Sequence, residues 1–168
     1  MTYPATPDKI EYPEILIYIP HVKIQPATLI SLMGYNYIPV ETLGDYGYYE
    51  YFKKRWEEGK TFINLEQDIV PYPGALKELW DCPQDWCMYD IHVPCRWNLN
   101  LEDSNIGGYP LGCMKISSEM IKSTPKLWEK PIKWDEIERI LIPGIFPVHQ
   151  HRPGVVNANP AYLGKELS

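Results

Sequence analysis

The first half of the chain alternates short apolar runs with amphipathic segments, and this alternation limits the folds open to it. Apolar runs rich in β-branched and aromatic residues predict strands, and each is followed by a segment with the apolar spacing of a helix. We expect strands at 14–19, 36–40 and 61–65 and helices at 26–33, 45–59 and 73–80. Such an order is typical of an open, mostly parallel α/β sheet. The prediction is a three-layer, Rossmann-like fold with helices on both faces.

Prolines lie at several boundaries between these predicted elements. The chain has 17 prolines, spread from Pro4 to Pro160 without a repeat period, which excludes collagen-like and polyproline folds. Pro20 is expected to end the first strand, while Pro26 and Pro73 suit the first turns of helices. The sequence therefore predicts many short elements joined by fixed turns.

The length and composition indicate one folded domain. The chain has 168 residues, of which 45% are hydrophobic and 13% aromatic, and this is too apolar for a disordered chain. No internal repeat or interdomain linker is visible. We predict a single domain over 1–168, with a core at about 14–156 and terminal extensions at 1–13 and 157–168.

The second half of the chain departs from the regular alternation. A strand is expected at 86–92, followed by a long polar loop at 93–110, and loops of this length are usually functional. A strand at 111–116 then leads into a helix capped by Ser117 or Ser118. A short amphipathic helix is expected at 134–141.

Charge and hydropathy argue against two classes of partner. The formal net charge is −6, and no stripe of Lys and Arg is present that could follow a phosphate backbone, so nucleic acid is not an expected partner. No run approaches the roughly 18 apolar residues of a membrane span, and residues 1–4 do not resemble an export signal. We expect a soluble, cytoplasmic protein.

Four cysteines are too few for a disulfide scaffold at this length. Cys82 and Cys87 are close enough in sequence to form a local disulfide, but reduced, half-buried thiols are the favoured interpretation. A zinc site is the third alternative. It is disfavoured because their spacing, without partner histidines, is poor for zinc.

Two carboxylates follow the third predicted strand. If the extended geometry persists, Glu66 and Asp68 point to one side and Gln67 points away. Neighbouring carboxylates repel one another unless a cation or a donor compensates them, and hard oxygen ligands suit Mg²⁺ or Mn²⁺. The alternative is a helix cap or a solvated turn.

A second pair of candidate ligands lies near the C-terminus. His149 and His151 alternate, so on an extended segment both imidazoles point to one side, and their nitrogens favour Mn²⁺ over Ca²⁺. Together with Glu66 and Asp68 they would form a metal site. The alternative is that one histidine packs on an aromatic ring while the other is solvated.

These segments resemble a group of small, mostly uncharacterised glycosyltransferase-like proteins of GT-A type. The resemblance covers roughly residues 14–156. It is carried by Phe62-Ile63-Asn64-Leu65-Glu66-Gln67-Asp68-Ile69-Val70, Pro73-Gly74-Ala75-Leu76, Cys82-Pro83-x-x-Trp86-Cys87, Leu111-Gly112-Cys113, Trp134-Asp135-x-x-Glu138 and His149-x-His151.

The resemblance implies a nucleotide-sugar donor and a divalent cation, Mn²⁺ or Mg²⁺. In the GT-A fold an Asp-x-Asp motif ends a central strand and holds the cation on the diphosphate, and a late histidine often completes the metal shell. Here Glu66 and Asp68 match that motif, with Glu in the first position, and His149 or His151 matches the histidine. The resemblance also implies that the end of the first strand, with Pro20 and His21, borders the nucleotide.

Transfer to an acceptor hydroxyl with inversion also needs a carboxylate base. The candidates are Glu102 and Asp103 in the long loop and Asp135 and Glu138 in the late helix, each of which has a solvated or helix-capping role as its alternative. Arg152 is a candidate phosphate ligand through its forked guanidinium, or else a surface ion pair.

The leading functional hypothesis is a metal-dependent glycosyltransferase that acts on an unknown acceptor. The short chain leaves little room for an acceptor-binding half, so a second subunit or a partner protein is expected to contribute to acceptor recognition. Three alternatives stay open: a nucleotide- or sugar-binding protein without transferase activity, a metal-dependent nucleotide or phosphoester hydrolase, and an aromatic-rich interaction module.

Overall fold

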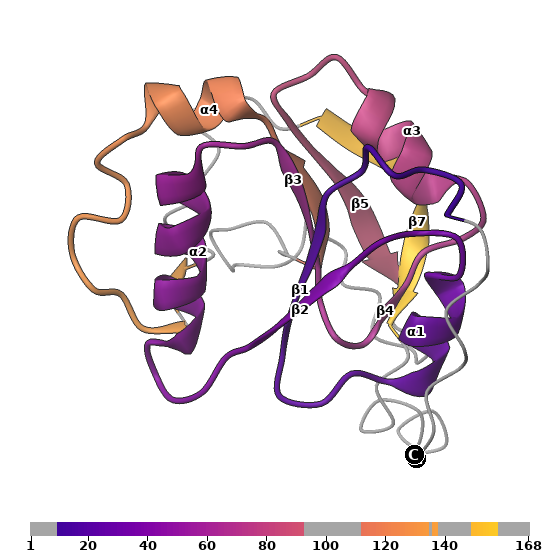
Figure 1. The fold of residues 1–168 in the computed structure, drawn as a ribbon, viewed down its shortest axis with the longest axis horizontal. Coiled ribbons are helices and arrows are strands. Elements are labelled where there is room, and N and C mark those ends of the chain that lie inside the picture. The colour runs from indigo at the N-terminus through magenta and orange to yellow at the C-terminus, as the bar shows by residue number, and fades with distance from the viewer. Residues whose placement is uncertain (1–9, 93–111, 135, 138–148, 158–168) are drawn as a thin grey trace.

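A computed structural model describes residues 10–92, 112–134, 136–137 and 149–157 of the chain (Figure 1). Its strands are β1 (Ile17–His21), β2 (Ile38–Glu41), β3 (Phe62–Leu65), β4 (Ile69–Val70), β5 (Trp86–His92), β6 (Cys113–Ile116) and β7 (His149–Asn157). Its helices are α1 (Pro26–Ser31), α2 (Gly47–Glu58), α3 (Ala75–Asp81) and α4 (Ser118–Ser123).

The strands form one open sheet in the order β2-β1-β3-β6-β5-β7-β4. β1 pairs in parallel with β2 and β3, and β5 pairs in parallel with β7. β6 lies between these two groups and is antiparallel to both neighbours, while β4 is antiparallel to β7 at the sheet edge. The α/β class and the open sheet are therefore confirmed, with an antiparallel strand inserted between two parallel groups.

Alternate strand residues enter two separate hydrophobic cores. One core contains Tyr18, Phe62 and Met88 together with residues of α2 and α4, and the other contains Ile17, Ile63 and residues of α3. Figure 1 shows α2 and α4 on one side of the sheet and α1 and α3 on the other. Burying a large apolar side chain stabilises a fold by about 1.5–3 kcal/mol, so both faces contribute to stability.

Several helix boundaries follow the predicted signals. Pro26 is the first residue of α1, and Gly59 ends α2 in a left-handed conformation with φ 68°. The Ser117 side chain caps α4 by accepting a hydrogen bond from the backbone N–H of Met120 at 3.1 Å. Ser117, one of the two predicted capping residues, therefore starts the helix after β6.

Two boundary predictions are wrong. Pro20 does not end β1 but pairs with Val40 inside it. The missing N–H is tolerated because β3 pairs with β1 only as far as Tyr18. The helix expected to be capped by Asp45 begins at Gly47, with Tyr46 in the capping position. A Cβ on Gly47 would lie 2.9 Å from the backbone carbonyl carbon of Thr42, so this tight approach requires glycine.

The sequence did not indicate β4, and it indicated β7 only as an extended segment carrying the two histidines. The long loop at 93–110 lies outside the described residues. In the helix expected at 134–141, residues 134, 136 and 137 are helical and the others lie outside the described part of the chain. The remaining predicted elements correspond to observed ones with bounds that differ by up to three residues.

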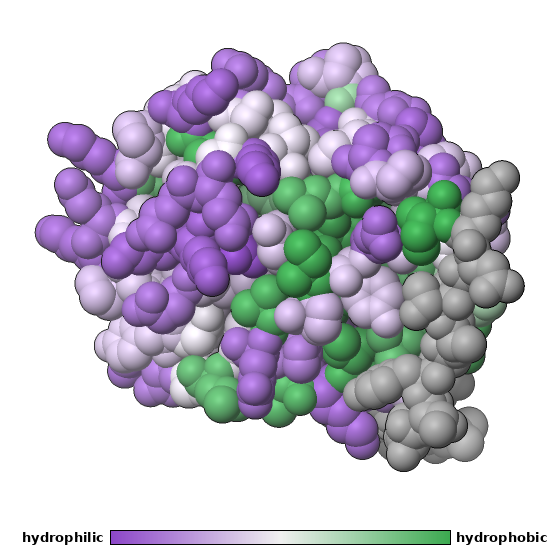
Figure 2. Space-filling view, in the orientation of Figure 1, coloured by the Kyte–Doolittle hydropathy of each residue, from purple (hydrophilic) through white to green (hydrophobic). Residues whose placement is uncertain are grey.

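The surface seen in Figure 2 has hydrophilic and hydrophobic regions. Around α2 it is mostly hydrophilic, whereas a hydrophobic band crosses the centre of the view, where Figure 1 places β1 and β2. Exposed apolar side chains include Ile38 on β2, Val22 just after β1 and Leu43 just after β2. None of the helices formed by the described residues has the length and apolar character needed to cross a bilayer.

Candidate metal-binding sites

The two carboxylates singled out in the sequence lie at the carboxyl end of β3. This strand is central, with β1 on one side and β6 on the other. The backbone N–H of Glu66 donates to the carbonyl of Gly112 at 2.8 Å, which continues the contact with the β6 side beyond the end of the strand. Asp68 follows in the turn and is 8% exposed, while Glu66 is half-buried.

The Gln67 side chain contacts a different part of the chain from the Glu66 side chain. Its Oε1 accepts hydrogen bonds from the backbone N–H groups of Val22 and Lys23, both at 2.8 Å. Its own carbonyl accepts from the N–H of Gln25 at 2.8 Å. Gln67 therefore fixes the turn that follows β1 against the end of β3, and this arrangement agrees with the predicted alternation of side chains.

The Tyr48 hydroxyl on α2 lies beside the acidic pair. It donates a hydrogen bond to Oε1 of Glu66 at 3.2 Å. Burial raises the pKa of Tyr48 far above its usual value, and the negative charges of Glu66 and Asp68 add to this rise. Tyr48 therefore joins α2 to the acidic residues that follow β3.

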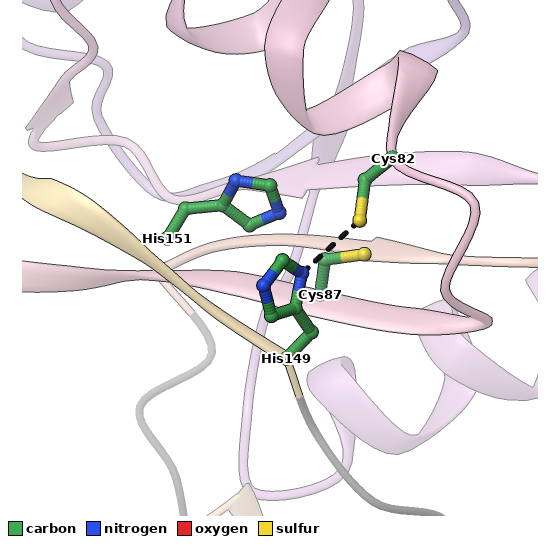
Figure 3. A group of neighbouring side chains, drawn as sticks. All are labelled: Cys82, Cys87, His149 and His151. Atoms are coloured by element: carbon green, nitrogen blue, oxygen red, sulfur yellow. Dashed lines mark hydrogen bonds between the residues drawn. The ribbon is translucent and has the colours of Figure 1, made fainter.

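A second group of ligand-type side chains gathers on the α3 face of the sheet (Figure 3). Cys82, Cys87, His149 and His151 each present one ligand atom, and these atoms all lie within 4.8 Å of one another. The parallel pairing of β5 and β7 sets His149 opposite Cys87 and His151 opposite Tyr89. Cys82 joins them from the residue that ends α3.

The internal contacts of this Cys/His cluster are close. Sγ of Cys82 lies 3.1 Å from Nδ1 of His149, and the two imidazole rings have centroids 4.5 Å apart. The Cys87 thiol donates to the carbonyl of Gln84 at 3.4 Å. Nε2 of His151 is buried and has no hydrogen-bond partner among the described residues.

A ring of polar groups surrounds His151. Oε1 of Glu78 on α3 lies 3.7 Å from its Nδ1, and the Tyr72 hydroxyl donates to the other oxygen of Glu78 at 3.1 Å. The Tyr89 hydroxyl donates to the carbonyl of Ala75 at 3.0 Å, and its oxygen lies 3.1 Å from that of Tyr72. These bonds hold Glu78 against the histidine.

Lys115 on β6 is buried beside the cluster, with 4% of its surface exposed. Its ammonium group donates to the carbonyl of Cys82 and to that of Trp80 at 3.5 Å. Cations are favoured at the C-terminal end of a helix, where carbonyl groups lack helical partners. Lys115 therefore holds the end of α3, and with it Cys82, over the sheet.

Burial sets the protonation of the inner ligands. It lowers the pKa of His151, and the neighbouring His149 lowers it further. It also raises the pKa of the Cys87 thiol to about 12. His151 is consequently held in the neutral form that binds metals, whereas Cys87 keeps its proton at neutral pH unless a cation displaces it.

The structure does not bring the histidines to the carboxylates. Ile69, which follows Asp68, pairs with Asn157 at one end of β7, whereas His149 begins that strand. His151 is matched to Tyr89 on β5, and Val156, the partner of Val70, is matched to His92. Three residues at about 3.3 Å each therefore place Val70 roughly 10 Å along the sheet from His151, and farther still from His149. The expected single site of Glu66, Asp68, His149 and His151 is therefore not formed, because the histidines lie at the start of β7 whereas the end of that strand pairs with β4 next to Asp68.

The other predicted site residues divide into two groups. Pro20 is buried in β1, and His21 ends that strand with its carbonyl accepting the N–H of Thr42 at 2.9 Å. The described part of the chain does not include the four candidate bases or the side chain of Arg152. The bases are Glu102, Asp103, Asp135 and Glu138.

The sequence singles out all four members of the Cys/His cluster, but as two separate pairs. By spacing alone the cysteines lack partner histidines and the histidines are grouped with Glu66 and Asp68, whereas the structure brings the two pairs together. Two Cys and two His are a common zinc ligand set, so the composition of the two pairs was itself a signal. Only the pairing of β5 with β7 joins them.

Comparisons with known proteins give distant similarities. No family model matches the chain, and no curated protein matches it. The crystal structure of a glycosyltransferase involved in glycosylation of the major capsid of PBCV-1 is 14% identical, with a TM-score of 0.48, over 90% of this chain and 98% of that one. A crystal structure of a STIV protein is 15% identical, with a TM-score of 0.47, over 64% of this chain and 66% of that one.

Proposed function

We propose that this chain transfers a sugar from a nucleotide-sugar to an acceptor hydroxyl, with Mn²⁺ or Mg²⁺ held at the end of β3. The observation that carries this proposal is the position of Glu66 and Asp68 at the carboxyl end of a central strand, where the Tyr48 hydroxyl donates to Glu66. The sequence resemblance to GT-A-type proteins supports the same assignment. We name the region formed by Glu66, Gln67 and Asp68 the acidic turn.

The sheet order supports a ligand site at the acidic turn. From β1 the chain first adds β2 on one side and then crosses to add β3 on the other. Open α/β sheets bind ligands beyond the carboxyl ends of their strands at such a reversal. The reversal here lies between β1 and β3, and Gln67 joins the two strand ends by its bonds to Val22 and Lys23.

The acidic turn suits a hard divalent cation, because it offers the carboxylate oxygens of Glu66 and Asp68, which are the ligands that such cations prefer. The late histidines are not part of this ligand set, so donor phosphates and water would complete the shell. A cation bound here would stabilise the negative charge that develops on the departing diphosphate.

The turn after β1 would contact the donor. The backbone N–H groups of Val22 and Lys23 already bond to Gln67, so phosphate oxygens would be met by side chains, with the exposed Lys23 ammonium as the cationic candidate. Pro20 and His21 precede this turn. The exposed apolar side chains of Val22 and Leu43 would flank a nucleotide base.

The proposed transfer forms one bond, breaks another and moves one proton. The acceptor oxygen forms a bond to the anomeric carbon, the bond from that carbon to the diphosphate oxygen breaks, and the diphosphate leaves with the electron pair. The hydroxyl proton passes to a carboxylate base. Glu102, Asp103, Asp135 and Glu138 are the candidates for this role.

Thermal unfolding tests donor binding. Melting temperatures would be measured with Mn²⁺ alone, with UDP, GDP, ADP or CDP alone, and with each nucleotide plus Mn²⁺. We expect one combination to raise the melting temperature well beyond the sum of its parts, because the cation bridges protein and diphosphate. If no combination does so, the proposed function is wrong.

A product assay separates transfer from the alternatives. The chain would be incubated with the nucleotide-sugar of the base that binds, Mn²⁺ and a panel of simple glycosides as acceptors. A glycoside extended by one sugar supports transfer. Free sugar as the sole product supports a hydrolase instead, and binding without any product supports a nucleotide- or sugar-binding protein.

A further inference from the structure

We propose that Cys82, Cys87, His149 and His151 bind one Zn²⁺ in a closed structural site that fastens β7 to β5 and to the end of α3. This site is separate from the acidic turn and does not depend on the proposed transferase activity. It rests on the close approach of the four ligand atoms and on the unpartnered, buried Nε2 of His151.

The spacing of the ligand atoms is close to that of a zinc tetrahedron. With Zn–S bonds of about 2.3 Å and Zn–N bonds of about 2.0 Å, the edges of a tetrahedron measure about 3.3–3.8 Å. Here all four atoms lie within 4.8 Å of one another, and Sγ of Cys82 is 3.1 Å from Nδ1 of His149. Side-chain adjustments of about 1 Å would bring every atom to bonding distance of a central ion.

His151 is oriented as a metal ligand. Its Nε2 is buried without a hydrogen-bond partner among the described residues, which is costly for a polar atom unless a ligand satisfies it. Its other ring nitrogen, Nδ1, faces Glu78 at 3.7 Å. A carboxylate behind a histidine commonly fixes the ring orientation of a zinc ligand.

The charges around the cluster balance for a divalent ion. Two thiolates neutralise Zn²⁺, and the two imidazoles bind as neutral groups. The carboxylate of Glu78 faces Nδ1 of His151 at 3.7 Å, and the Lys115 ammonium bonds to the carbonyl of Cys82, so one group of each sign borders the site.

Two soft thiolates and two imidazoles select zinc over the harder cations. Mg²⁺ and Mn²⁺ prefer oxygen ligands, whereas sulfur and nitrogen in a tetrahedral arrangement are typical of zinc. Four protein ligands leave no open position for a substrate, which is the pattern of a structural site. Cys82 and His149 lie 67 positions apart in the sequence, so the ion would close a long loop of the chain.

Metal analysis tests the site directly. Protein purified without chelators is expected to contain one equivalent of zinc per chain. After removal of the zinc, added Co²⁺ should produce the visible bands of a tetrahedral complex and a near-ultraviolet thiolate-to-cobalt band. Protein that contains no metal and binds neither Zn²⁺ nor Co²⁺ would overturn the proposal. Nucleotides are absent throughout, so the result is independent of the proposed function.

Substitutions at the two more exposed ligands, Cys82 and His149, test which residues bind the zinc. Cys82 is half-buried and His149 is exposed, so Cys82→Ser and His149→Asn should fold, and circular dichroism would verify this. Each should lose most of the bound zinc, and Cys82→Ser should also weaken the thiolate band of the cobalt protein.

Matched controls use residues outside the cluster. Cys113→Ser alters a buried free cysteine and His21→Asn alters a histidine at the end of β1, and both should retain one equivalent of zinc. Full zinc content in Cys82→Ser and His149→Asn would refute the ligand set. A thiol titration that finds a Cys82–Cys87 disulfide in the purified protein would also refute it.

Discussion

The acidic turn and the Cys/His cluster are assembled in different ways. The acidic turn takes its carboxylates from one tripeptide at a strand end, so local geometry brings Glu66 and Asp68 together. The cluster takes its ligands from the residue after α3, from β5 and from β7, which meet only because β5 and β7 pair in parallel. A tripeptide motif can therefore be interpreted from sequence, whereas a site built across a sheet depends on the strand order.

The two regions also differ in the chemistry that they offer. The acidic turn presents hard oxygen atoms, which suit a cation that keeps open positions for phosphate and water. The cluster presents two sulfur and two nitrogen atoms, which suit a cation that is fully enclosed by protein. Under the two proposals, one region binds a transient ligand and the other a permanent one, so they should respond differently to the same treatments.

The largest expected difference concerns chelation. Removing zinc with a strong chelator should lower the melting temperature by roughly 10 °C, because free zinc far above its dissociation constant stabilises the fold by mass action. The acidic turn should contribute nothing to this change in the absence of nucleotide. Differential scanning calorimetry with and without chelator measures it.

The control for chelation is restoration. Adding Zn²⁺ back should recover the original melting temperature, whereas Mg²⁺ should not, since it does not replace zinc at thiolate ligands. Equal recovery with both ions would mean that the stabilising cation binds at oxygen atoms, and the contrast between the two regions would fail.

Much of the local structure was predictable from the sequence. The strand at Trp86–His92 has the predicted bounds, and Ser117 caps the helix that follows β6. The alternation of His149 and His151 correctly predicted that both would face one way. These features depend on neighbours a few residues apart, where backbone geometry and hydrogen bonding are decisive.

The partners of the histidines were not predictable in the same way. His149 meets Cys87 through strand register, and no local pattern encodes which strands become neighbours. Lys115 is a similar case, because its burial beside Cys82 follows from the position of β6 next to β5. Cation binding by Glu66 and Asp68 and the base role of the four carboxylates stay predictions.

After chelation, the next largest change in melting temperature is expected for a substitution at Asp68. Asp68→Asn keeps the size of the side chain but removes its charge, so the gain in melting temperature from Mn²⁺ with a nucleoside diphosphate, roughly 5 °C, should disappear. Zinc content should stay at one equivalent. Thermal unfolding and metal analysis on the same sample measure the two quantities.

Glu57→Gln is the matched control for this change, because it neutralises an exposed carboxylate on α2. It should retain the full nucleotide gain. Loss of zinc in Asp68→Asn would show that the acidic turn and the cluster are not independent.

A smaller effect is expected at Glu78, behind His151. Glu78→Gln keeps an oxygen that accepts the Tyr72 hydroxyl but removes the negative charge facing Nδ1 of His151. Zinc affinity should fall about tenfold, which corresponds to about 1.4 kcal/mol. Competition with a chromophoric chelator measures it. Glu119→Gln, an exposed change on α4, serves as control and should leave the affinity unchanged. An unchanged affinity in Glu78→Gln would mean that the carboxylate does not act on the zinc ligand.

The smallest effect is expected at Tyr48, beside the acidic turn. Tyr48→Phe retains the ring packed near Tyr51 and Phe52 but removes the hydroxyl that donates to Glu66. The free energy of unfolding should fall by about 1 kcal/mol, as for one hydrogen bond, and chemical denaturation measures it. Tyr46→Phe, at an exposed position, is the control and should change the free energy by less than about 0.5 kcal/mol. Zinc content should be unaffected, because this hydroxyl contacts the acidic turn rather than the cluster. A loss of zinc in Tyr48→Phe would contradict the separation of the two regions, since the change removes one contact at the acidic turn.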